Sequence, residues 1–450
     1  MKSPRQLAGV SRRLLGFFSG LCLLGPSSVL AAASYGILPQ DVGSAQALSP
    51  FSSRASAAFY NPAALVLSPR GELTGAILHA DHELNGRSLG GEAPLERDGQ
   101  RLSDTPSQQL QLGLKTDLSG LTLSDHPILL GVMLGSDRFT KEIMAFEAAT
   151  SREGQFMRYQ RQPLLLSVGV GTRVWRGLNL GAGVRVTLRN EADLFVNTDL
   201  GGNTESEALS VSASPTLSPV VGATLDLGET FGGGQGWMQG LSLAASYRGY
   251  ASNRTQVAAE AEIDGVVQDP GLELALNTFD AFTPATFTLA SQYLFGTGTT
   301  FGLALEYQDW SKVQEDLARD TVHDQAQIQF RDVLIPRLGF AHPLNDWLTV
   351  RGGVAWERSA LESGPQLNVN YLDNDRIVLG VGASATLPQF APLAYPITLE
   401  FGYQYQELRD RDFELYSDDP ANPTGPDAPF ETLQANGSVH VFSGSLTLTF

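Results

Sequence analysis

The chain has 450 residues, a net charge of −18, a single cysteine and a mean hydropathy of −0.07. An acidic chain repels phosphate, which argues against a nucleic-acid partner. After residue 24 no apolar run approaches the length of about 18 residues that a membrane-spanning helix needs. A transmembrane β-barrel stays compatible with this hydropathy, because only alternate residues of its strands face lipid.

Residues 1–33 are predicted to be a cleaved signal peptide. Four basic residues precede an apolar run at 14–24, and three alanines at 31–33 supply a small-residue cleavage site. The run is about half as long as a membrane-spanning helix, which argues against the alternative of an uncleaved anchor. Cleavage takes the net charge to −22 and removes Cys22, so the mature chain has neither a disulfide nor a thiol nucleophile.

Residues 34–70 are predicted to form a compact plug. They show no alternation of apolar and polar residues and are rich in Ala, Ser, Gly and Pro. Small residues pack well inside a barrel, and about fourteen strands enclose more space than their own side chains can fill. Asn61-Pro62 favours a turn near the end of this segment.

Residues 71–450 are predicted to form a transmembrane antiparallel β-barrel. Apolar and polar residues alternate with a period of two in segments such as 178–189, 209–228, 300–310 and 395–406, a pattern that no helix can hold on one face. Counting such segments indicates about fourteen strands in an all-β fold. The glycines at 169, 171, 181, 183, 380 and 382 fall on the lumen-facing side of this alternation and are interpreted as small lumen positions.

The predicted connections alternate in length. Long ones are expected at roughly 84–105, 137–160, 263–283 and 417–431, and short ones near 176–177, 296–299 and 343–346. Long extracellular loops and short periplasmic turns are typical of outer-membrane barrels. The five Trp residues lie near predicted strand ends, as expected of an interfacial belt, and the chain ends on Phe450 after alternating apolar residues. We therefore expect an outer-membrane location with both termini periplasmic.

The segment around Asn61, Pro62 and Ala63 resembles the hatch of FadL-type outer-membrane transporters of long-chain fatty acids and hydrocarbons (OMPP1/FadL/TodX-like), which carry an Asn-Pro-Ala motif directly before the first strand. Segments 162–186, 307–311 and 346–353 are also similar to the family. The resemblance implies a monomeric barrel with a lumenal hatch, inserted by the barrel assembly machinery. It also implies capture of substrate at extracellular loops and lateral exit into lipid beside a kinked third strand.

Three sets of residues are candidates for handling substrate. Gly131 and Gly135 in the predicted third strand, 126–136, could permit the kink that a lateral gap needs. Arg185 and Arg351 face the lumen and could pair with a substrate carboxylate, although a mutually paired ladder of lumenal charges is the alternative. Aromatic residues in the long connections are candidates for apolar capture: Phe139, Phe146, Phe156, Phe279 and Phe282.

The predicted function is passive uptake of hydrophobic molecules, with long-chain fatty acids as the first candidate. Uptake of alkanes or aromatic hydrocarbons by the same fold is an alternative, and so are a nonspecific porin and an outer-membrane lipase. The sequence contains no metal-binding, nucleotide-binding or nucleophile-elbow motif, so neither a cofactor, a metal nor an enzymatic activity is predicted.

Overall fold

The computed structural model describes residues 35–91, 106–121, 126–137, 164–198, 204–231, 236–263, 267–318, 329–362, 373–388, 394–415, 428–429 and 431–450. Sixteen strands form one sheet in this part of the chain. They are β1 (Glu72–Gly91), β2 (Ser107–Asp117), β3 (Ile128–Asp137), β4 (Leu164–Trp175), β5 (Leu178–Thr198), β6 (Thr204–Asp226), β7 (Leu241–Arg248), β8 (Ala251–Ile263), β9 (Val267–Thr283), β10 (Ala285–Leu294), β11 (Thr300–Asp309), β12 (Val333–Pro343), β13 (Leu348–Glu357), β14 (Arg376–Leu387), β15 (Ile397–Leu415) and β16 (Glu431–Thr449).

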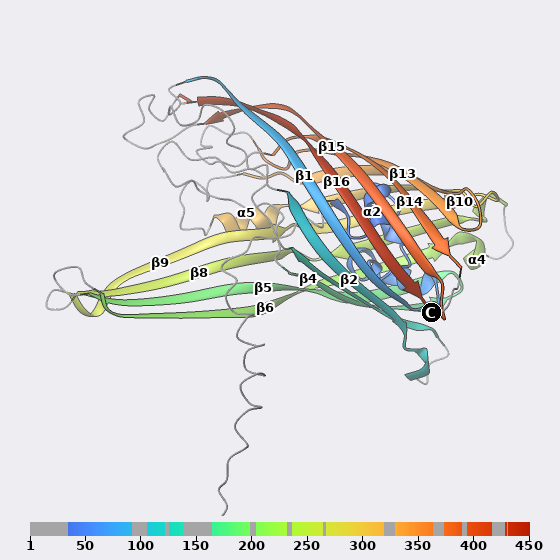
Figure 1. The fold of residues 1–450 in the computed structure, drawn as a ribbon, viewed down its shortest axis with the longest axis horizontal. Coiled ribbons are helices and arrows are strands. Elements are labelled where there is room, and N and C mark those ends of the chain that lie inside the picture. Colours follow the sequence, from blue (N-terminus) through green and yellow to red (C-terminus); the bar gives the residue numbers. More distant parts are fainter. Residues whose placement is uncertain are drawn as a thin grey trace, which may run out of the picture.

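Fourteen of these strands close into an antiparallel barrel (Figure 1). Each pairs with its neighbour around the ring, β1 pairs with β16, and the pairing of β4 with β5 completes the closure. The remaining two, β8 and β9, continue the chain beyond the ring. This confirms the predicted fold class of a barrel with about fourteen strands.

The alternation in the sequence separates a lipid-facing surface from a lumen-facing one. On β15, Leu399 and Phe401 are 43% and 52% exposed, whereas Glu400 and Gln404 between and after them are buried. Leu and Phe residues on the outer surface meet lipid, which explains why so many large apolar side chains are exposed. The inward-facing residues are buried because the lumen is filled.

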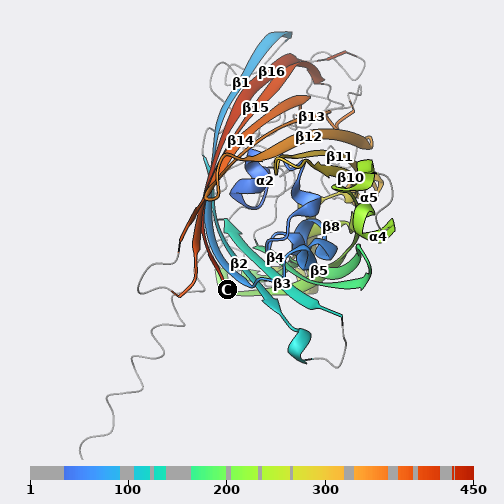
Figure 2. The ribbon, with the colours of Figure 1, turned by 90° about the vertical axis from the view of Figure 1, so that its right-hand side faces the viewer.

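The filling comes from residues 35–70, which we call the hatch segment. It contains α2 (Pro39–Gly43), η1 (Ser49–Phe51), α3 (Ala57–Tyr60) and η2 (Pro62–Leu67), and Figure 2 shows these short helices inside the ring of strands. Four further short helices lie elsewhere: η4 (Ser119–Leu121), α4 (Leu227–Phe231), η5 (Gly236–Met238) and α5 (Ser311–Leu317). None of the described helices is long and apolar enough to cross a membrane.

The two ends of the barrel differ in their connections. At one end, which we call the turn end, β4 and β5 join through Arg176 and Gly177, and Gly71 exchanges backbone hydrogen bonds of 2.8 and 2.9 Å with Phe450. At the other end, which we call the loop end, the ring strands run into longer connections, and α5 lies in one of them. The C-terminus is therefore fixed at the turn end, as Figure 1 shows.

Two sequence expectations were wrong at the level of single elements. The long loop expected at 263–283 is instead strand β9, which pairs with β8 along most of its length. Trp310, expected in the interfacial belt, is fully buried and stacks on Phe330 with ring centroids 5.0 Å apart. The other four Trp residues are 43% to 57% exposed, as an interfacial position requires: Trp175, Trp237, Trp347 and Trp356.

Candidate functional site

The Asn-Pro-Ala motif of the hatch segment is seated on a wall of glycines. The amide Nδ2 of Asn61 donates to the carbonyl oxygens of Pro50 (2.9 Å) and Ala223 (3.3 Å), and its Oδ1 accepts from the Ala63 N–H at 3.2 Å. A Cβ at Gly222 would overlap the Asn61 side chain, and one at Gly181 would overlap the backbone of Ala63. Glycine is therefore required on β5 and β6 so that hatch and strand can approach this closely.

The same wall continues across two more strands. A Cβ at Gly169 on β4 would lie 3.1 Å from Pro62, and one at Gly171 would overlap the Pro62 carbonyl oxygen. On β3, a Cβ at Gly131 would lie 2.7 Å from Cδ2 of Leu65. Of the glycines interpreted from the sequence as small lumen positions, Gly169, Gly171 and Gly181 therefore face the hatch segment, whereas a Cβ at Gly183 would meet the backbone of β4.

A second glycine wall lies on β13 and β14 and receives α2. A Cβ at Gly380 would lie 2.6 Å from the carbonyl oxygen of Val42 and 2.8 Å from that of Gly43. One at Gly353 would overlap the carbonyl group of Ser44. The hatch segment thus touches the barrel wall backbone to backbone on two sides.

Buried ion pairs also hold the hatch segment. Arg54 lies 3.1 Å from Glu72 and 3.2 Å from Glu400. The Lys115 ammonium donates to the carbonyl oxygens of Ser53 and Ser68 at 2.7 and 2.6 Å. A buried ion pair adds little net stability, but loss of one partner leaves an uncompensated buried charge, so these contacts fix where the hatch sits.

Within the hatch segment, the Asp41 carboxylate ties α2 to η1. It accepts from the Leu38 N–H at 2.9 Å and from the Ser49 hydroxyl at 2.6 Å. Burial raises the pKa of Asp41 to about 6, and the hydrogen bond from Ser49 partly opposes that rise. The short helices of the hatch therefore form one connected unit.

A second chain of charges runs along the lumen wall. Glu306 lies 3.1 Å from Arg248 and 3.7 Å from Arg337, and Glu357 lies 2.9 Å from Arg337 and 3.4 Å from Arg376. A cavity of about 10 Å³ between this chain and Tyr60 has room for one water molecule. The boundary between hatch and wall is therefore tightly filled at this level.

The two arginines proposed from the sequence have different surroundings. Arg351 lies 3.8 Å from Glu400 and hydrogen-bonds to Ser384, so the paired-ladder alternative describes it better. Arg185 is 1% exposed, and among the described residues no carboxylate pairs with it. Its Nη2 donates to the Gly249 carbonyl oxygen at 2.8 Å, and its Nε has no hydrogen-bond partner in the part of the chain that the structure describes.

The surroundings of Arg185 are partly aromatic. Its guanidinium lies 5.9 Å from the ring centroid of Phe59, and that of Arg248 lies 4.8 Å from the same ring. Stacking on an aromatic face compensates part of the cost of burying a cation. Arg185 therefore keeps a free donor inside the lumen.

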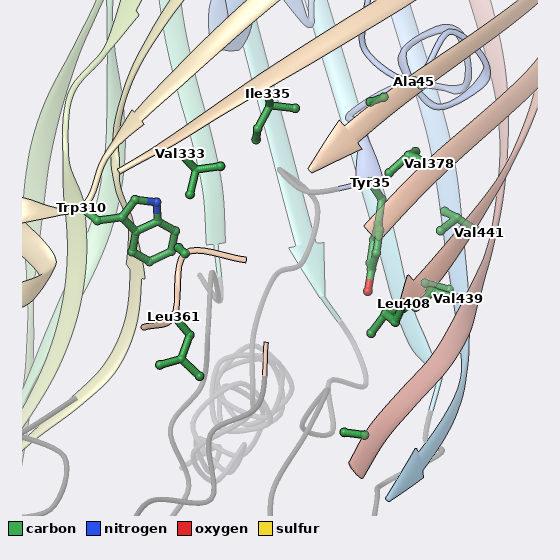
Figure 3. Close-up of a cluster of buried hydrophobic side chains, with 14 of the residues drawn as sticks. Tyr35, Ala45, Trp310, Val333, Ile335, Leu361, Val378, Leu408, Val439 and Val441 are labelled. Atoms are coloured by element: carbon green, nitrogen blue, oxygen red, sulfur yellow. The ribbon is translucent and has the colours of Figure 1, made fainter. Parts of the chain in front are cut away.

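Towards the loop end, the lumen is lined by apolar side chains, which we call the apolar lumen cluster. Figure 3 shows Val333 and Ile335 on one side and Val439 and Val441 on the other, with Trp310 and Tyr35 also in the cluster. Leu78 and Ala80 of β1 and Leu408 of β15 belong to the same cluster. A porin lumen is polar, so this lining suits an apolar ligand.

The apolar lumen cluster was missed from the sequence, although a signal for it exists. Near the loop end both faces of some strands are apolar, as in Val333-Leu334-Ile335 and Val439-His440-Val441-Phe442. A run that is apolar on both faces indicates a strand buried on both sides. The period-two alternation by itself predicts a lumen face that is polar throughout.

Strand β3, where a lateral gap was expected, is paired along its length. Ile128–Asp137 is in register with β2 on one side and with β4 on the other, and no register shift occurs at Gly131 or Gly135. A Cβ at Gly135 would lie 3.3 Å from Leu165. The wall is closed here in this conformation, and Leu65 of the hatch segment stands in front of Gly131.

The structure describes two of the five aromatic capture candidates. Phe139, Phe146 and Phe156 lie outside the described residues. Phe279 and Phe282 are on β9, where the register sets them opposite Arg254 and Ser252. Their role stays a prediction.

Comparison with known proteins gives consistent results. A family model described as outer membrane protein transport protein (OMPP1/FadL/TodX) matches residues 40–450. Alkane uptake protein A of Marinobacter nauticus is 43% identical over 426 residues, which cover 93% of this chain and 90% of that protein.

Two solved structures are similar in fold. A Pseudomonas aeruginosa FadL homologue has a TM-score of 0.57 at 15% identity, over 91% of this chain and 98% of that chain. The P. putida toluene transporter TodX has a TM-score of 0.53 at 13% identity, over 93% of this chain and 99% of that chain.

Proposed function

Because this chain belongs to the OMPP1/FadL/TodX family of outer membrane transport proteins, we propose that it carries alkane-like hydrocarbons passively across the outer membrane. The relative with 43% identity is an alkane uptake protein. The observation that carries the proposal is the apolar lumen cluster, because an alkane can be bound only through apolar contact. Each buried CH₂ group contributes about 0.8 kcal/mol, so a long chain needs no polar anchor.

The hatch segment separates this lining from the turn end. Its glycine-wall contacts place hatch backbone directly against the strands, and Arg54 joins it to Glu72 and Glu400 of the wall. A nonspecific porin needs an open polar lumen, so the filled boundary supports a hydrophobic carrier. Uptake then follows the downhill gradient of the substrate.

Exit is proposed to be lateral, through the wall at β3. The side chains in front of this wall are apolar, with Met133 and Leu165 packed against Phe59 of the hatch segment. Opening requires Leu65 to move away from Gly131 on the lumen side of the wall. It also requires β3 to break backbone pairing with β4. Unpaired backbone facing lipid is costly, which supports a gap that forms only during passage.

Long-chain fatty acids are the second candidate, because of Arg185. A carboxylate could accept a charge-assisted hydrogen bond from its free Nε, and no described carboxylate competes for that place. Phe59 beside it belongs to the apolar group that includes Leu165 and Met133. A fatty acid would thus find a cation next to an apolar surface.

Labelled hexadecane, oleate and toluene, supplied to cells with and without the gene, test the proposal. Hexadecane uptake should rise when the gene is present, while uptake of a small polar solute should not change. Equal hexadecane uptake with and without the gene would contradict hydrocarbon transport. Increased uptake of the polar solute when the gene is present would indicate a porin.

A further inference from the structure

The loop-end part of the apolar lumen cluster lies past the ends of the ring strands. Trp310 and Val313 follow β11, and Ala360 and Leu361 follow β13, so these residues stand at the mouth of the barrel. Each of the four is at most 1% exposed. Phe330 packs against them and stacks on Trp310. We call these five residues the roof layer.

The roof layer and the hatch segment belong to the same apolar cluster. Tyr35, Val42 and Ala45 of the hatch segment are members of it. Figure 3 shows Trp310 and Leu361 on one side of the lumen and Tyr35 away from them. Because the hatch segment fills the lumen from the turn end, a ligand from outside reaches this cluster from the loop end. The roof layer is on that path.

Two short segments carry the roof layer, and a single β-bridge between Phe330 and Leu361 pairs their backbones. Backbone hydrogen bonds of 2.8 and 2.9 Å flank the bridge: Arg331 N–H to the Ala360 carbonyl and Glu362 N–H to the Gln329 carbonyl. The Arg331 side chain adds a bond from Nε to the Ser359 carbonyl oxygen at 3.1 Å. Ring strands such as β3 are instead paired along their length on both sides. Among the described residues, this bridge is therefore a weakly fastened place.

A buried arginine fastens the segment that contains Leu361. Arg411 of β15 donates to the Ser359 hydroxyl at 2.6 Å and to the carbonyl oxygens of Asp373 and Leu361 at 2.8 and 2.9 Å. The Asp373 carboxylate accepts from the Ser359 hydroxyl at 2.9 Å and from the Ala360 N–H at 3.0 Å. Ser359 and Asp373 are both buried. We call Arg411, Ser359 and Asp373 the clasp.

The segment that contains Phe330 is fixed to a different part of the wall. The Phe330 N–H donates to Oε1 of Gln314 on α5 at 2.9 Å. The Trp310 N–H donates to the Asp332 carboxylate at 2.9 Å. Each half of the roof layer thus has its own anchor, so the halves can part at the bridge without either being released from the barrel.

We propose that the roof layer is the entrance to the apolar lumen cluster, that it opens where the Phe330–Leu361 bridge parts, and that Arg411 is the positioning residue that holds it shut. The inference rests on the proposed function, since a hydrocarbon carrier needs a way into this cluster. The polar groups that part at the loop end can bind water instead, whereas parting ring strands would expose backbone to lipid. A hydrocarbon inserted between Phe330 and Leu361 covers both side chains, so little apolar surface meets water during passage.

Paired cysteines at the bridge test whether the two segments must part. The flanking hydrogen bonds make Phe330 and Leu361 a pair without direct backbone bonds, with Cα atoms about 4.5 Å apart, which a disulfide can span. The mature chain is expected to contain no other cysteine. Phe330→Cys/Leu361→Cys in nanodiscs should bind the apolar fluorophore phenylnaphthylamine about tenfold more slowly when oxidised than when reduced. Each single variant should bind it equally fast in both states.

Substitutions at Arg411 test the clasp without a disulfide. Arg411→Met removes the three donated bonds, and phenylnaphthylamine should then bind several-fold faster. Arg411→Lys keeps a cation that can hold one of the acceptors, so its rate should lie between the two. Arg358→Met is the matched control, because Arg358 lies over the exposed Trp356 ring, 5.0 Å from its centroid, and should bind at the unmodified rate. A merely structural role of Arg411 would lower the yield of folded barrel and would not speed binding.

Uptake in cells separates the entrance from the proposed function. Hexadecane uptake through the double-cysteine variant should fall on oxidation and recover on reduction. A disulfide that forms without slowing the fluorophore would overturn the inference, and so would an Arg411→Met variant that binds at the unmodified rate. If hexadecane does not enter even with the unmodified chain, the proposed function fails, while the fluorophore rates still decide whether the roof layer is an entrance.

Discussion

The turn-end half of the lumen and the loop-end half are filled with opposite chemistry. Near the turn end, Arg54 pairs with both Glu72 and Glu400, and glycines let the hatch segment touch the wall backbone to backbone. Towards the loop end, Val333, Val439 and their neighbours form an apolar lining, with the charge chain from Glu306 to Arg376 confined to one part of the wall beside it. The first half depends on directional contacts that fix one position, and the second on contact area that accepts many ligands. We therefore interpret the turn-end contacts of the hatch segment as a seal and the apolar lumen cluster as a binding surface.

Among substitutions that disturb the seal, a larger side chain at Gly222 should have the largest effect. Its Cβ would overlap Asn61, so Gly222→Val displaces the Asn-Pro-Ala motif and opens the lumen. Ion conductance in planar bilayers should rise from a closed level to that of an open porin. Gly75→Val is the matched control, because nothing lies within 4 Å of a Cβ there, and it should stay closed. A closed Gly222→Val channel would mean that this contact does not maintain the seal.

The ion pairs of the turn-end half should matter next. Arg54→Met leaves Glu72 and Glu400 buried without their shared partner, which should cost about 3 kcal/mol of unfolding free energy. Urea unfolding in detergent micelles measures the loss. Adding Glu72→Gln should recover part of it, since Glu72 is the carboxylate that loses its ion pair, whereas Glu400 keeps Arg351. A loss below about 0.5 kcal/mol would show that water already reaches these carboxylates.

In the loop-end half, hexadecane uptake should depend strongly on the polarity of a substituted side chain and little on its shape. Ile335→Asn puts an amide into the apolar lumen cluster and should reduce hexadecane uptake by about tenfold, the equivalent of losing the burial of about two CH₂ groups. Ile335→Val keeps the apolar character and should stay close to the unmodified rate. Equal uptake by both variants would remove the apolar lumen cluster from the transport path.

The smallest expected effect concerns Arg185, and it is selective. Arg185→Gln should lower oleate uptake several-fold, about the difference between a charge-assisted hydrogen bond and the neutral one that Gln can still donate, and leave hexadecane uptake unchanged. Arg351→Gln is the comparison, because Arg351 is already engaged by Glu400 and Ser384. A loss of both substrates with Arg185→Gln would indicate a packing role on Phe59 instead of carboxylate binding.

The sequence predicted some of these regions better than others. Period-two alternation suffices for the barrel, because the two faces of a strand meet lipid and lumen. The position of the Asn-Pro-Ala motif before β1 suffices to suggest a hatch. The pairing of Arg351 with Glu400 could not be predicted, because it depends on register between strands 49 positions apart in sequence. Strand β9 looked like a loop, because Pro270 and Gly271 stand in it, and such residues are tolerated in an edge strand that pairs with β8 alone among the described strands.

The central claim is that hydrophobic substrate leaves the apolar lumen cluster sideways while the seal stays closed. Gly131→Val in β3 would meet Leu65 of the hatch segment, and Gly135→Val would meet Leu165. Hexadecane uptake and ion conductance should be measured together for the unmodified protein and for Gly131→Val. The account predicts uptake without conductance in the first, and slowed uptake with unchanged surface binding in the second. Uptake that rises and falls with conductance, or a Gly131→Val variant that transports normally, would contradict it.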